Sequence, residues 1–250
     1  MSTDKDWELW GKSNPYFGVL SDERFLGRSL NKEMADEFYA SGVADVENLI
    51  SSITQINHGE KPFFNQAVDF GCGVGRLTLP LSKYARKVTG LDVSPSMVKQ
   101  ARLELPSKMK NITYVVSDDE LTNLPKNYDL VYSNIVLQHI PPRRGEAIID
   151  TLLAQLQTGG YAALHVTYGH QATSLNKLVI KLRGNVPIVH YLLNVLRGRP
   201  FKTPLMRMHV YDFNRVLSMY YRAGLKDLSV TMTTHGDYDG AMIIGKKEAN

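Results

Sequence analysis

The feature that most constrains the fold is a glycine-rich turn between an apolar strand and a helix. Residues 68–77 read Val-Asp-Phe-Gly-Cys-Gly-Val-Gly-Arg-Leu, with glycine at alternate positions from Gly71 to Gly75. Glycine lets the backbone approach a ligand closely, and the amides at the start of the following helix can face that ligand. The third glycine of a dinucleotide fingerprint would fall on Arg76, which weighs against NAD. The pattern predicts a ligand-binding loop, with a merely tight turn as the alternative.

Short apolar runs alternate with amphipathic stretches from residue 66 onward, which is typical of βα units around a mostly parallel sheet. They predict seven strands, at residues 67–70, 87–92, 112–116, 128–134, 161–167, 225–233 and 240–246. Helices are expected at 76–85, 95–105, 143–156 and 212–223, with one or two cover helices within 30–56. We therefore expect a doubly wound α/β domain over residues 61–250, a helical cover over 1–60 and a basic helical insert over 170–210 above the active site.

The composition is that of a globular chain with one core. Of 250 residues, 43% are hydrophobic, which suffices for a sizeable core. No run of eighteen apolar residues occurs, and the acidic start lacks the basic-then-apolar order of a secretory signal, so we expect a soluble, cytoplasmic protein. Cys72 is the only cysteine, which excludes an intramolecular disulfide and a cysteine-based metal cage. No metal site is predicted.

Charge is distributed unevenly along the chain. The net charge is +4, yet residues 1–60 hold eleven acidic against five basic residues. No Asp or Glu occurs between Asp150 and Asp212, whereas seven basic residues do: Lys177, Lys181, Arg183, Arg197, Arg199, Lys202 and Arg207. Three interpretations stay open for this insert: a solvated basic face, arginines that bind an anionic substrate group, and contact with anionic membrane through the apolar residues beside them.

Three further positions are placed to contact a nucleoside. Asp92 ends the second predicted strand about twenty residues after the glycine loop, where a carboxylate can accept both hydroxyls of a ribose. A helix-capping role for Asp92 is weaker, because Ser94 followed by Pro95 already provides a cap and a first helical turn. Met97 could pack on an adenine ring, with filling of the core as the alternative. Asp118 could accept a hydrogen bond from an adenine amino group, with a place in a solvated acidic loop as the alternative.

These motifs resemble the class I S-adenosylmethionine-dependent methyltransferase family, in its small-substrate branch. The matching motifs are Asp69-x-Gly71-x-Gly73-x-Gly75, Asp92 and Tyr128-Asp129-Leu130-Val131, and the similarity covers residues 65–168. The resemblance implies a seven-stranded Rossmann-like sheet in the order 3-2-1-4-5-7-6. It also implies S-adenosyl-L-methionine as the cofactor and S-adenosyl-L-homocysteine as the product.

The resemblance also assigns roles to residues. The glycine loop would hold the methionine part of the cofactor, Asp92 the ribose, Asp118 with Asp119 the adenine, and Ser133 with Asn134 would border the methyl group. The full set expected to bind the cofactor is Asp69, Gly71, Cys72, Gly73, Gly75, Arg76, Asp92, Val93, Met97, Asp118, Asp119, Ser133 and Asn134. Four N-terminal aromatic residues either close over the cofactor or anchor the N-terminal segment: Trp7, Trp10, Tyr16 and Phe17.

A sulfonium methyl is already activated, so the protein must mainly align the acceptor and exclude water. A hydroxyl acceptor also requires a general base, most often a histidine. We expect His139, directly after the fourth strand, or His235, with Asp237 near it in sequence, to serve as this base; each could instead have a structural role. His165, within a strand, is interpreted as a core residue. The residues expected to line the substrate site are Tyr168, His170, Arg207, His209 and Tyr238.

The function favoured by these features is methylation of a small molecule or glycan, on a hydroxyl of a sugar or an anionic metabolite that could be lipid-linked. Nucleic-acid methylation ranks second, since the chain has a basic stretch but neither a separate RNA-binding module nor an Asn-Pro-Pro-Tyr-type loop after the fourth strand. A non-catalytic protein that binds the cofactor and acts through partners is the remaining alternative. The sequence shows no transmembrane segment, and peripheral membrane contact stays open.

Overall fold

A computed structural model describes residues 3–26, 29–171, 187–196, 201 and 203–249. Seven strands form one sheet in the order β3-β2-β1-β4-β5-β7-β6, which confirms the predicted topology. All neighbours are parallel except β7, which is antiparallel to both β5 and β6. The strands are β1 (Phe64–Phe70), β2 (Ala85–Asp92), β3 (Ile112–Val116), β4 (Tyr128–Ser133), β5 (Leu156–His170), β6 (Ser229–His235) and β7 (Tyr238–Lys246).

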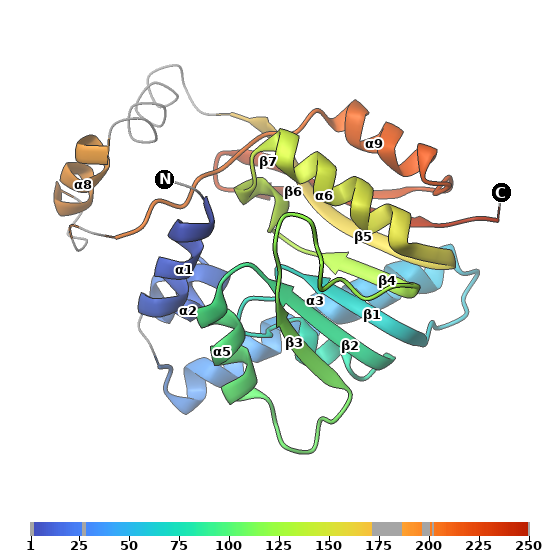
Figure 1. Ribbon diagram of the computed structural model, residues 1–250, viewed down its shortest axis with the longest axis horizontal. Coiled ribbons are helices and arrows are strands. Elements are labelled where there is room, and N and C mark those ends of the chain that lie inside the picture. Colours follow the sequence, from blue (N-terminus) through green and yellow to red (C-terminus); the bar gives the residue numbers. More distant parts are fainter. Residues whose placement is uncertain (1–2, 27–28, 172–186, 197–200, 202, 250) are drawn as a thin grey trace.

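Helices cover both faces of this sheet (Figure 1). On one face, α3 (Lys32–Ile56), α4 (Thr78–Leu81) and α5 (Pro95–Glu104) pack on the sheet through an apolar cluster that includes Ile53, Leu81 and Val98. On the other face, α6 (Pro142–Gln155) and α9 (Phe213–Arg222) do so through Leu152 and Tyr220. The three layers place the carboxyl ends of β1, β2 and β4 side by side, where ligands bind in open α/β sheets.

The N-terminal segment is more helical than the sequence pattern indicated. α1 (Thr3–Ser13), α2 (Pro15–Val19) and the short 3₁₀ helix η1 (Glu23–Phe25) precede α3, which is one continuous helix. They enclose a third apolar cluster with Trp10, Phe38 and Met97 at its centre. Short helices like these depend on such packing rather than on their own propensity.

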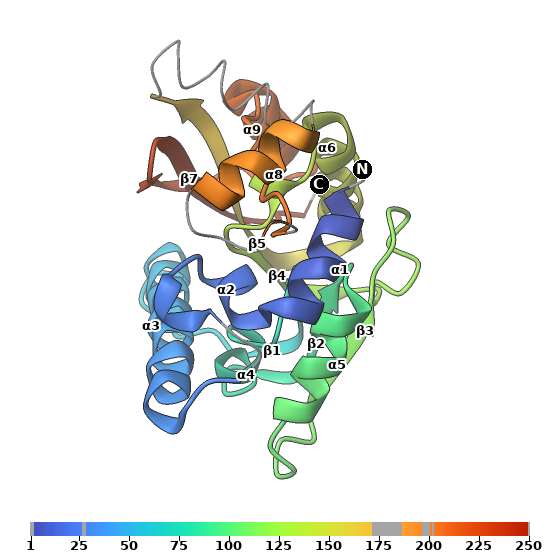
Figure 2. The same cartoon turned by 90° about the vertical axis from the view of Figure 1, so that its left-hand side faces the viewer.

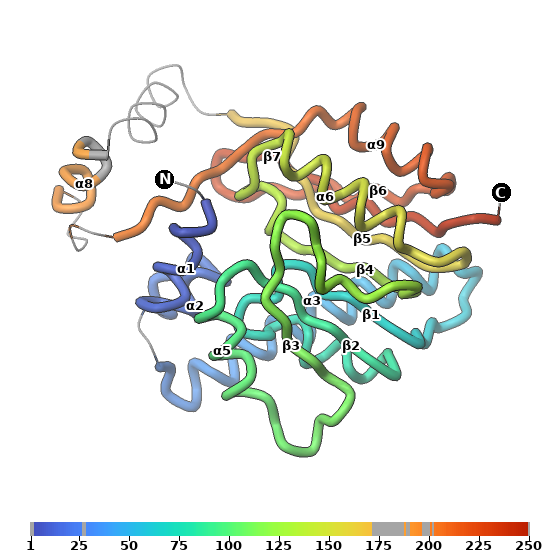
Figure 3. The backbone as a smooth tube through the Cα atoms, in the orientation of Figure 1, coloured from blue at the N-terminus to red at the C-terminus, as the bar shows by residue number. Residues whose placement is uncertain are grey.

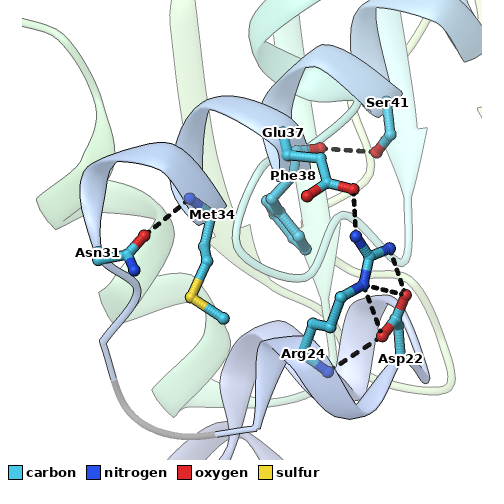
Figure 4. Close-up of polar contacts among 7 residues, drawn as sticks. All are labelled: Asp22, Arg24, Asn31, Met34, Glu37, Phe38 and Ser41. Atoms are coloured by element: carbon cyan, nitrogen blue, oxygen red, sulfur yellow. Dashed lines mark hydrogen bonds and ion pairs between the residues drawn. The ribbon is translucent and has the colours of Figure 1, made fainter.

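Polar contacts connect η1 to the start of α3, as Figure 4 shows. Arg24 donates to Asp22 and, at 2.5 Å, to Glu37 on α3. The side chain of Asn31 caps α3 by accepting a hydrogen bond from the amide of Met34 at 2.8 Å. The Asn31 cap specifies where α3 begins and is worth about 1 kcal/mol, whereas the exposed ion pairs of Arg24 add little stability.

Several element boundaries differ from the sequence prediction. The helix expected over residues 76–85 is only the single turn α4, because the chain must reach β2 at Ala85 and Pro80 cannot donate in the turn. β5 begins at Leu156, which pairs with Tyr128 of β4, and it extends to His170 because β7 pairs along it. β6 begins at Ser229, and Leu225 forms an isolated bridge to Lys247.

The expected insert is described only in part. The structure describes α8 (Pro187–Leu196), residue 201 and the chain from residue 203 onward, whereas residues 172–186, 197–200 and 202 lie outside the described part. Figures 1 and 3 show α8 standing apart from the sheet, on the side where α1 lies. Within the described part of the chain, no helix has the length and apolar character needed to cross a membrane. The proposed division into a cover, a domain and an insert stays a prediction.

Candidate active site

A cavity lies where the carboxyl ends of β1, β2 and β4 meet the N-terminal helices. Its volume is about 970 Å³, counting the space open to solvent at its mouth. The glycine loop and Asp92 line it on the sheet side, and α1 and α2 line the other side. Nine residues expected to bind a cofactor are among those that line it: Gly71, Cys72, Gly73, Arg76, Asp92, Val93, Met97, Asp118 and Asn134.

The glycine loop has a backbone that only glycine adopts readily. Gly71, Gly73 and Gly75 all have positive φ, at 76°, 53° and 89°. A Cβ on Gly71 would lie 2.4 Å from the methyl groups of Val136, and one on Gly75 would lie 2.2 Å from the hydroxyl oxygen of Tyr114. Alternating glycines therefore serve two purposes here, since they permit the turn and leave room for neighbouring side chains.

Asp92 lines the cavity and also shapes its rim. One carboxylate oxygen accepts a hydrogen bond from the amide of Gly73 at 2.9 Å, and the other accepts from the amide of Ser94 at 2.8 Å. Burial raises the pKa of Asp92 to about 6, against these hydrogen bonds, which lower it. Ser94 caps α5 by accepting from the amide of Met97 at 3.2 Å, as the sequence predicted. The remaining lone pairs of Asp92 are thus available to hydroxyl donors in the cavity.

Four residues of the expected cofactor set do not line the cavity. Asp69 is fully buried and accepts a hydrogen bond from the hydroxyl of Thr78 at 2.5 Å, and its pKa is raised to about 6 by burial. Ser133 donates to the carbonyl of Phe70 at 3.0 Å. The other two are Gly75, which packs against Tyr114, and Asp119, which pairs with Arg144. These residues support the loops around the cavity, and their roles toward a ligand stay predictions.

The N-terminal helices form one wall of the cavity, and the sequence predicted only part of this wall. Trp7 of α1 lines the cavity, as one of its two alternatives predicted, whereas Trp10, Tyr16 and Phe17 are buried in the N-terminal apolar cluster. Arg144 of α6 also lines the cavity, and its guanidinium binds Asp4 of α1 at 2.7 Å. No local motif marks Arg144, because its role depends on contact between distant segments.

Glu8 fixes α1 to the start of α5. Its carboxylate accepts hydrogen bonds from the hydroxyl of Ser94 at 2.7 Å and from the hydroxyl and amide of Ser96 at 2.8 Å and 3.1 Å. Burial opposes the shift, but these hydrogen bonds outweigh it and lower the pKa of Glu8 to about 2. Since Asp92 lies two residues before Ser94, α1 is anchored directly beside the cavity.

His139, of the two histidines considered as a base, is the one that lines the cavity. It ends the 3₁₀ helix η2 (Leu137–His139) after β4, and it is 6% exposed. Its Nδ1 lies 2.7 Å from the carbonyl oxygen of Arg207 and its ring contacts Trp7 edge-on at 4.9 Å. A carbonyl only accepts, so Nδ1 carries the proton, and Nε2 accepts a 3.4 Å hydrogen bond from the side-chain amide of Gln138. Burial lowers the pKa of His139 to about 4, despite that hydrogen bond.

His235 lies at the end of β6 and is not among the residues that line this cavity. Its ring centroid is 5.2 Å from that of His165, which is buried, as expected, and bonds the hydroxyl of Thr233 at 2.7 Å. Burial lowers the pKa of both histidines, that of His165 to about 4. A catalytic role for His235 stays a prediction.

The expected substrate residues fall into two groups. At the β5 and β6–β7 end, His170 stacks on Tyr238 at 4.2 Å between ring centroids, and Tyr168 packs on Phe213. The second group adjoins His139. There the Arg207 side chain lies 3.8 Å from Asp6, and the amide of His209 donates to the carbonyl of Gln138.

Three buried atoms in this second group have no hydrogen-bond partner among the described residues: Asp6 Oδ2, Arg207 Nε and His209 Nε2. Burial raises the pKa of Asp6 and lowers that of His209. Buried polar atoms without partners are uncommon, and they concentrate where a water or a ligand belongs.

Residues 67–160 match a family model described as methyltransferase domain. Among curated proteins, carboxy-S-adenosyl-L-methionine synthase of Actinobacillus succinogenes is 25% identical over 60% of this chain and 64% of its own length. Malonyl-[acyl-carrier protein] O-methyltransferase 1 of Ilyobacter polytropus is 33% identical over 46% of this chain and 41% of its own length. The matches thus span less than two thirds of these relatives.

Solved structures extend the likeness over nearly the whole chain. The N-methyltransferase NodS of Bradyrhizobium japonicum WM9, in complex with S-adenosyl-L-homocysteine, covers 100% of both chains with a TM-score of 0.63 and 13% identity. Magnesium protoporphyrin IX methyltransferase of Synechocystis PCC 6803, with bound S-adenosylmethionine, covers 99% of this chain and 98% of its own with a TM-score of 0.61 and 17% identity. At this identity the likeness shows a shared fold.

Proposed function

Since residues 67–160 match a methyltransferase-domain family model, we propose that this chain is an S-adenosylmethionine-dependent methyltransferase that acts on a hydroxyl of a small molecule or glycan. The observation that carries the proposal is the cavity in which the Gly71–Gly73 turn, Asp92 and His139 face a common space. This cavity is lined by a carboxylate, Asp92, that is proposed to bind the ribose and by a histidine, His139, that is proposed as the general base. Bound S-adenosylmethionine supplies the activated methyl group.

The cavity fits this cofactor in its donors and acceptors. Asp92 is positioned to accept the ribose hydroxyls, because its carboxylate is already held by the amides of Gly73 and Ser94. Met97 and Val93 offer an apolar wall beside Asp118 for the adenine. The Asp118 carboxylate already accepts from the amide of Thr122 at 2.8 Å, so it would use a further lone pair for the adenine amino group.

His139 would act as the general base toward the acceptor hydroxyl. The carbonyl of Arg207 holds its Nδ1 proton, and Nε2 would accept the proton that the hydroxyl releases once the hydroxyl displaces the 3.4 Å contact from the Gln138 side chain. With a pKa of about 4, this histidine is neutral at physiological pH and is a weak base. A weak base suits a hydroxyl that is itself acidic, which favours a phenol over a sugar alcohol.

The polar atoms next to His139 favour an acceptor molecule that carries an anionic group. Arg207 Nε and His209 Nε2 are buried and have no hydrogen-bond partner among the described residues, and Arg207 Nε forms a 3.8 Å ion pair with Asp6. A carboxylate or phosphate on the acceptor would accept from Arg207, whose planar guanidinium binds such groups through paired hydrogen bonds. Among the relatives, the ubiquinone biosynthesis O-methyltransferase of Coxiella burnetii, 34% identical over 37% of this chain, agrees with oxygen as the methylated atom.

The experiment measures S-adenosyl-L-homocysteine formed by the purified chain with S-adenosylmethionine and a panel of acceptors. The panel holds carboxylated phenols, phosphorylated sugars, neutral sugars and RNA. Turnover with an anionic hydroxyl compound is expected, and the Asp92→Asn variant, assayed at a low cofactor concentration, serves as the control with weakened cofactor binding. Turnover with RNA alone would replace the proposal with its nucleic-acid alternative. Tight cofactor binding without turnover of any acceptor would favour a non-catalytic role.

A further inference from the structure

Helix α8 exposes an apolar stripe to solvent. Ile188, Leu192 and Val195 follow one another at helical spacing, and their exposed fractions are 55%, 53% and 55%. Leu196, next to them, is 81% exposed. Isolated exposed leucines are ordinary on protein surfaces, but four large apolar side chains on one face of a ten-residue helix are not. A stripe of this kind is typical of a surface that contacts another molecule or a membrane.

The orientation of this stripe is set by contacts on the other side of α8. Asn194 is fully buried and donates to the carbonyls of Phe201 and Thr203 at 3.3 Å and 3.0 Å. Tyr191 packs on Phe201 with 4.8 Å between the ring centroids. Because the chain that follows α8 occupies this side, the stripe faces outward. Figure 1 shows the helix standing clear of the sheet, and in Figure 2, seen from that side, α8 lies in front of the sheet.

The charge of the sequence around α8 indicates which kind of surface the stripe contacts. The sequence contains no acidic residue between Asp150 and Asp212, an interval that includes α8 and seven basic residues. Negatively charged lipid headgroups attract basic segments, and an apolar helix face can enter the boundary between headgroups and acyl chains. Apolar and electrostatic attraction therefore act in the same direction at this part of the chain.

We propose that the stripe of Ile188, Leu192, Val195 and Leu196 docks the protein on a membrane surface that contains anionic lipids. A second copy of the chain fits the same surface poorly. It would bring another acid-free basic segment against this one, and a ten-residue helix face offers far less than the roughly 800 Å² per partner of a stable interface. The proposal does not depend on methyl transfer, since docking requires neither cofactor nor acceptor.

Co-sedimentation with vesicles tests this proposal, with no cofactor present. Vesicles of phosphatidylcholine and phosphatidylglycerol in equal parts are compared with phosphatidylcholine alone, at low and high salt. The chain is expected to bind the mixed vesicles at least about tenfold more strongly, and salt is expected to weaken that binding. No binding to the mixed vesicles at low salt, or equal binding to both kinds, would overturn the proposal.

A pair of matched variants tests the stripe itself. I188E/L192E places two carboxylates on it and is expected to lower vesicle binding by at least about tenfold, since burying two such side chains contributes more than one decade of affinity. L26E/L103E makes the same charge change at two exposed leucines outside the insert, 50% and 71% exposed, and is expected to bind vesicles more tightly than I188E/L192E. Equal losses in both variants would contradict docking through α8.

A fluorescent label gives a readout that does not depend on charge. Cys72 is buried and its thiol pKa is raised by burial, so a cysteine introduced as L192C is labelled selectively. An environment-sensitive dye at this position is expected to shift to the blue on mixed vesicles, whereas a dye on L103C is not. The absence of a shift at L192C alongside co-sedimentation would place the docking surface elsewhere and refute the proposal.

Discussion

Asp92 illustrates how one side chain can both build a site and serve it. Its two oxygens hold the amides of Gly73 and Ser94, so the glycine loop and the start of α5 keep their places before any ligand arrives. Burial raises its pKa to about 6, which means that the carboxylate ionises within the range where enzymes are commonly assayed. Its charge should therefore be visible in the pH dependence of cofactor binding.

Affinity for S-adenosyl-L-homocysteine is expected to fall as the pH drops below about 6, because protonated Asp92 loses its charge-assisted hydrogen bonds to the ribose. If the ionised form alone binds, the affinity falls about tenfold per pH unit. Isothermal calorimetry between neutral and acidic pH measures this. Asp92→Asn is expected to bind about tenfold to a hundredfold more weakly at neutral pH. A fall that persists in the variant would assign it to Asp69, whose pKa is also raised to about 6.

His139→Gln is expected to lower kcat by about 10²–10⁴-fold with little change in cofactor affinity, since the side chain acts on the acceptor. Steady-state rates and calorimetry on the same preparations separate the two effects. His235→Gln is the companion variant, and it is expected to retain turnover because His235 does not line the cavity. A large loss in His235→Gln together with a normal rate in His139→Gln would reverse the assignment of the base.

Gly71→Ala is expected to destabilise the fold, because Gly71 has a φ of 76° and its new Cβ would lie 2.4 Å from Val136. The backbone strain alone costs about 1–3 kcal/mol. Gly59→Ala is the matched control, since Gly59 has a φ of 94° but no atom within 4 Å of the added Cβ. Urea denaturation should show the larger loss of unfolding free energy for Gly71→Ala. Equal losses would mean that close approach to Val136 is unimportant.

At the scale of elements, α1 closes a cavity that the sheet leaves open. Glu8 attaches its middle to the start of α5, and Arg144 of α6 pairs with Asp4 near its beginning. The helix therefore bridges two elements that flank the cofactor cavity on opposite sides of the sheet. α1 therefore forms a wall of the cavity that is attached at two points.

Glu8→Ala is expected to speed dissociation of S-adenosyl-L-homocysteine by about tenfold, because three hydrogen bonds that hold α1 beside Asp92 are lost. Stopped-flow displacement measures the rate. Lys12→Ala is the control: it removes an ion pair of Glu8 in which the lysine side chain is 61% exposed, and such pairs contribute little. An unchanged dissociation rate in Glu8→Ala would show that α1 does not retain the cofactor.

At the scale of the whole molecule, the sequence predicted the order of the sheet, and nine of the residues that it marked for cofactor binding line one cavity. The glycine loop, Asp92 and the capping Ser94 are local motifs, so each could be recognised within a few residues. The residues around His139, where the acceptor is proposed to bind, could not be predicted from local motifs. Trp7, His139 and Arg207 meet only because α1, η2 and the segment before α9 fold together, and no spacing in the sequence encodes such contacts.

The measurement that tests the proposed function most directly is calorimetric titration of the purified chain with S-adenosyl-L-homocysteine, followed by a crystal structure of the complex. We expect one molecule bound per chain, with its ribose on Asp92 and its homocysteine part along the Gly71–Gly75 loop. Absence of binding by the folded chain, or binding at a site remote from this loop, would contradict the proposed function.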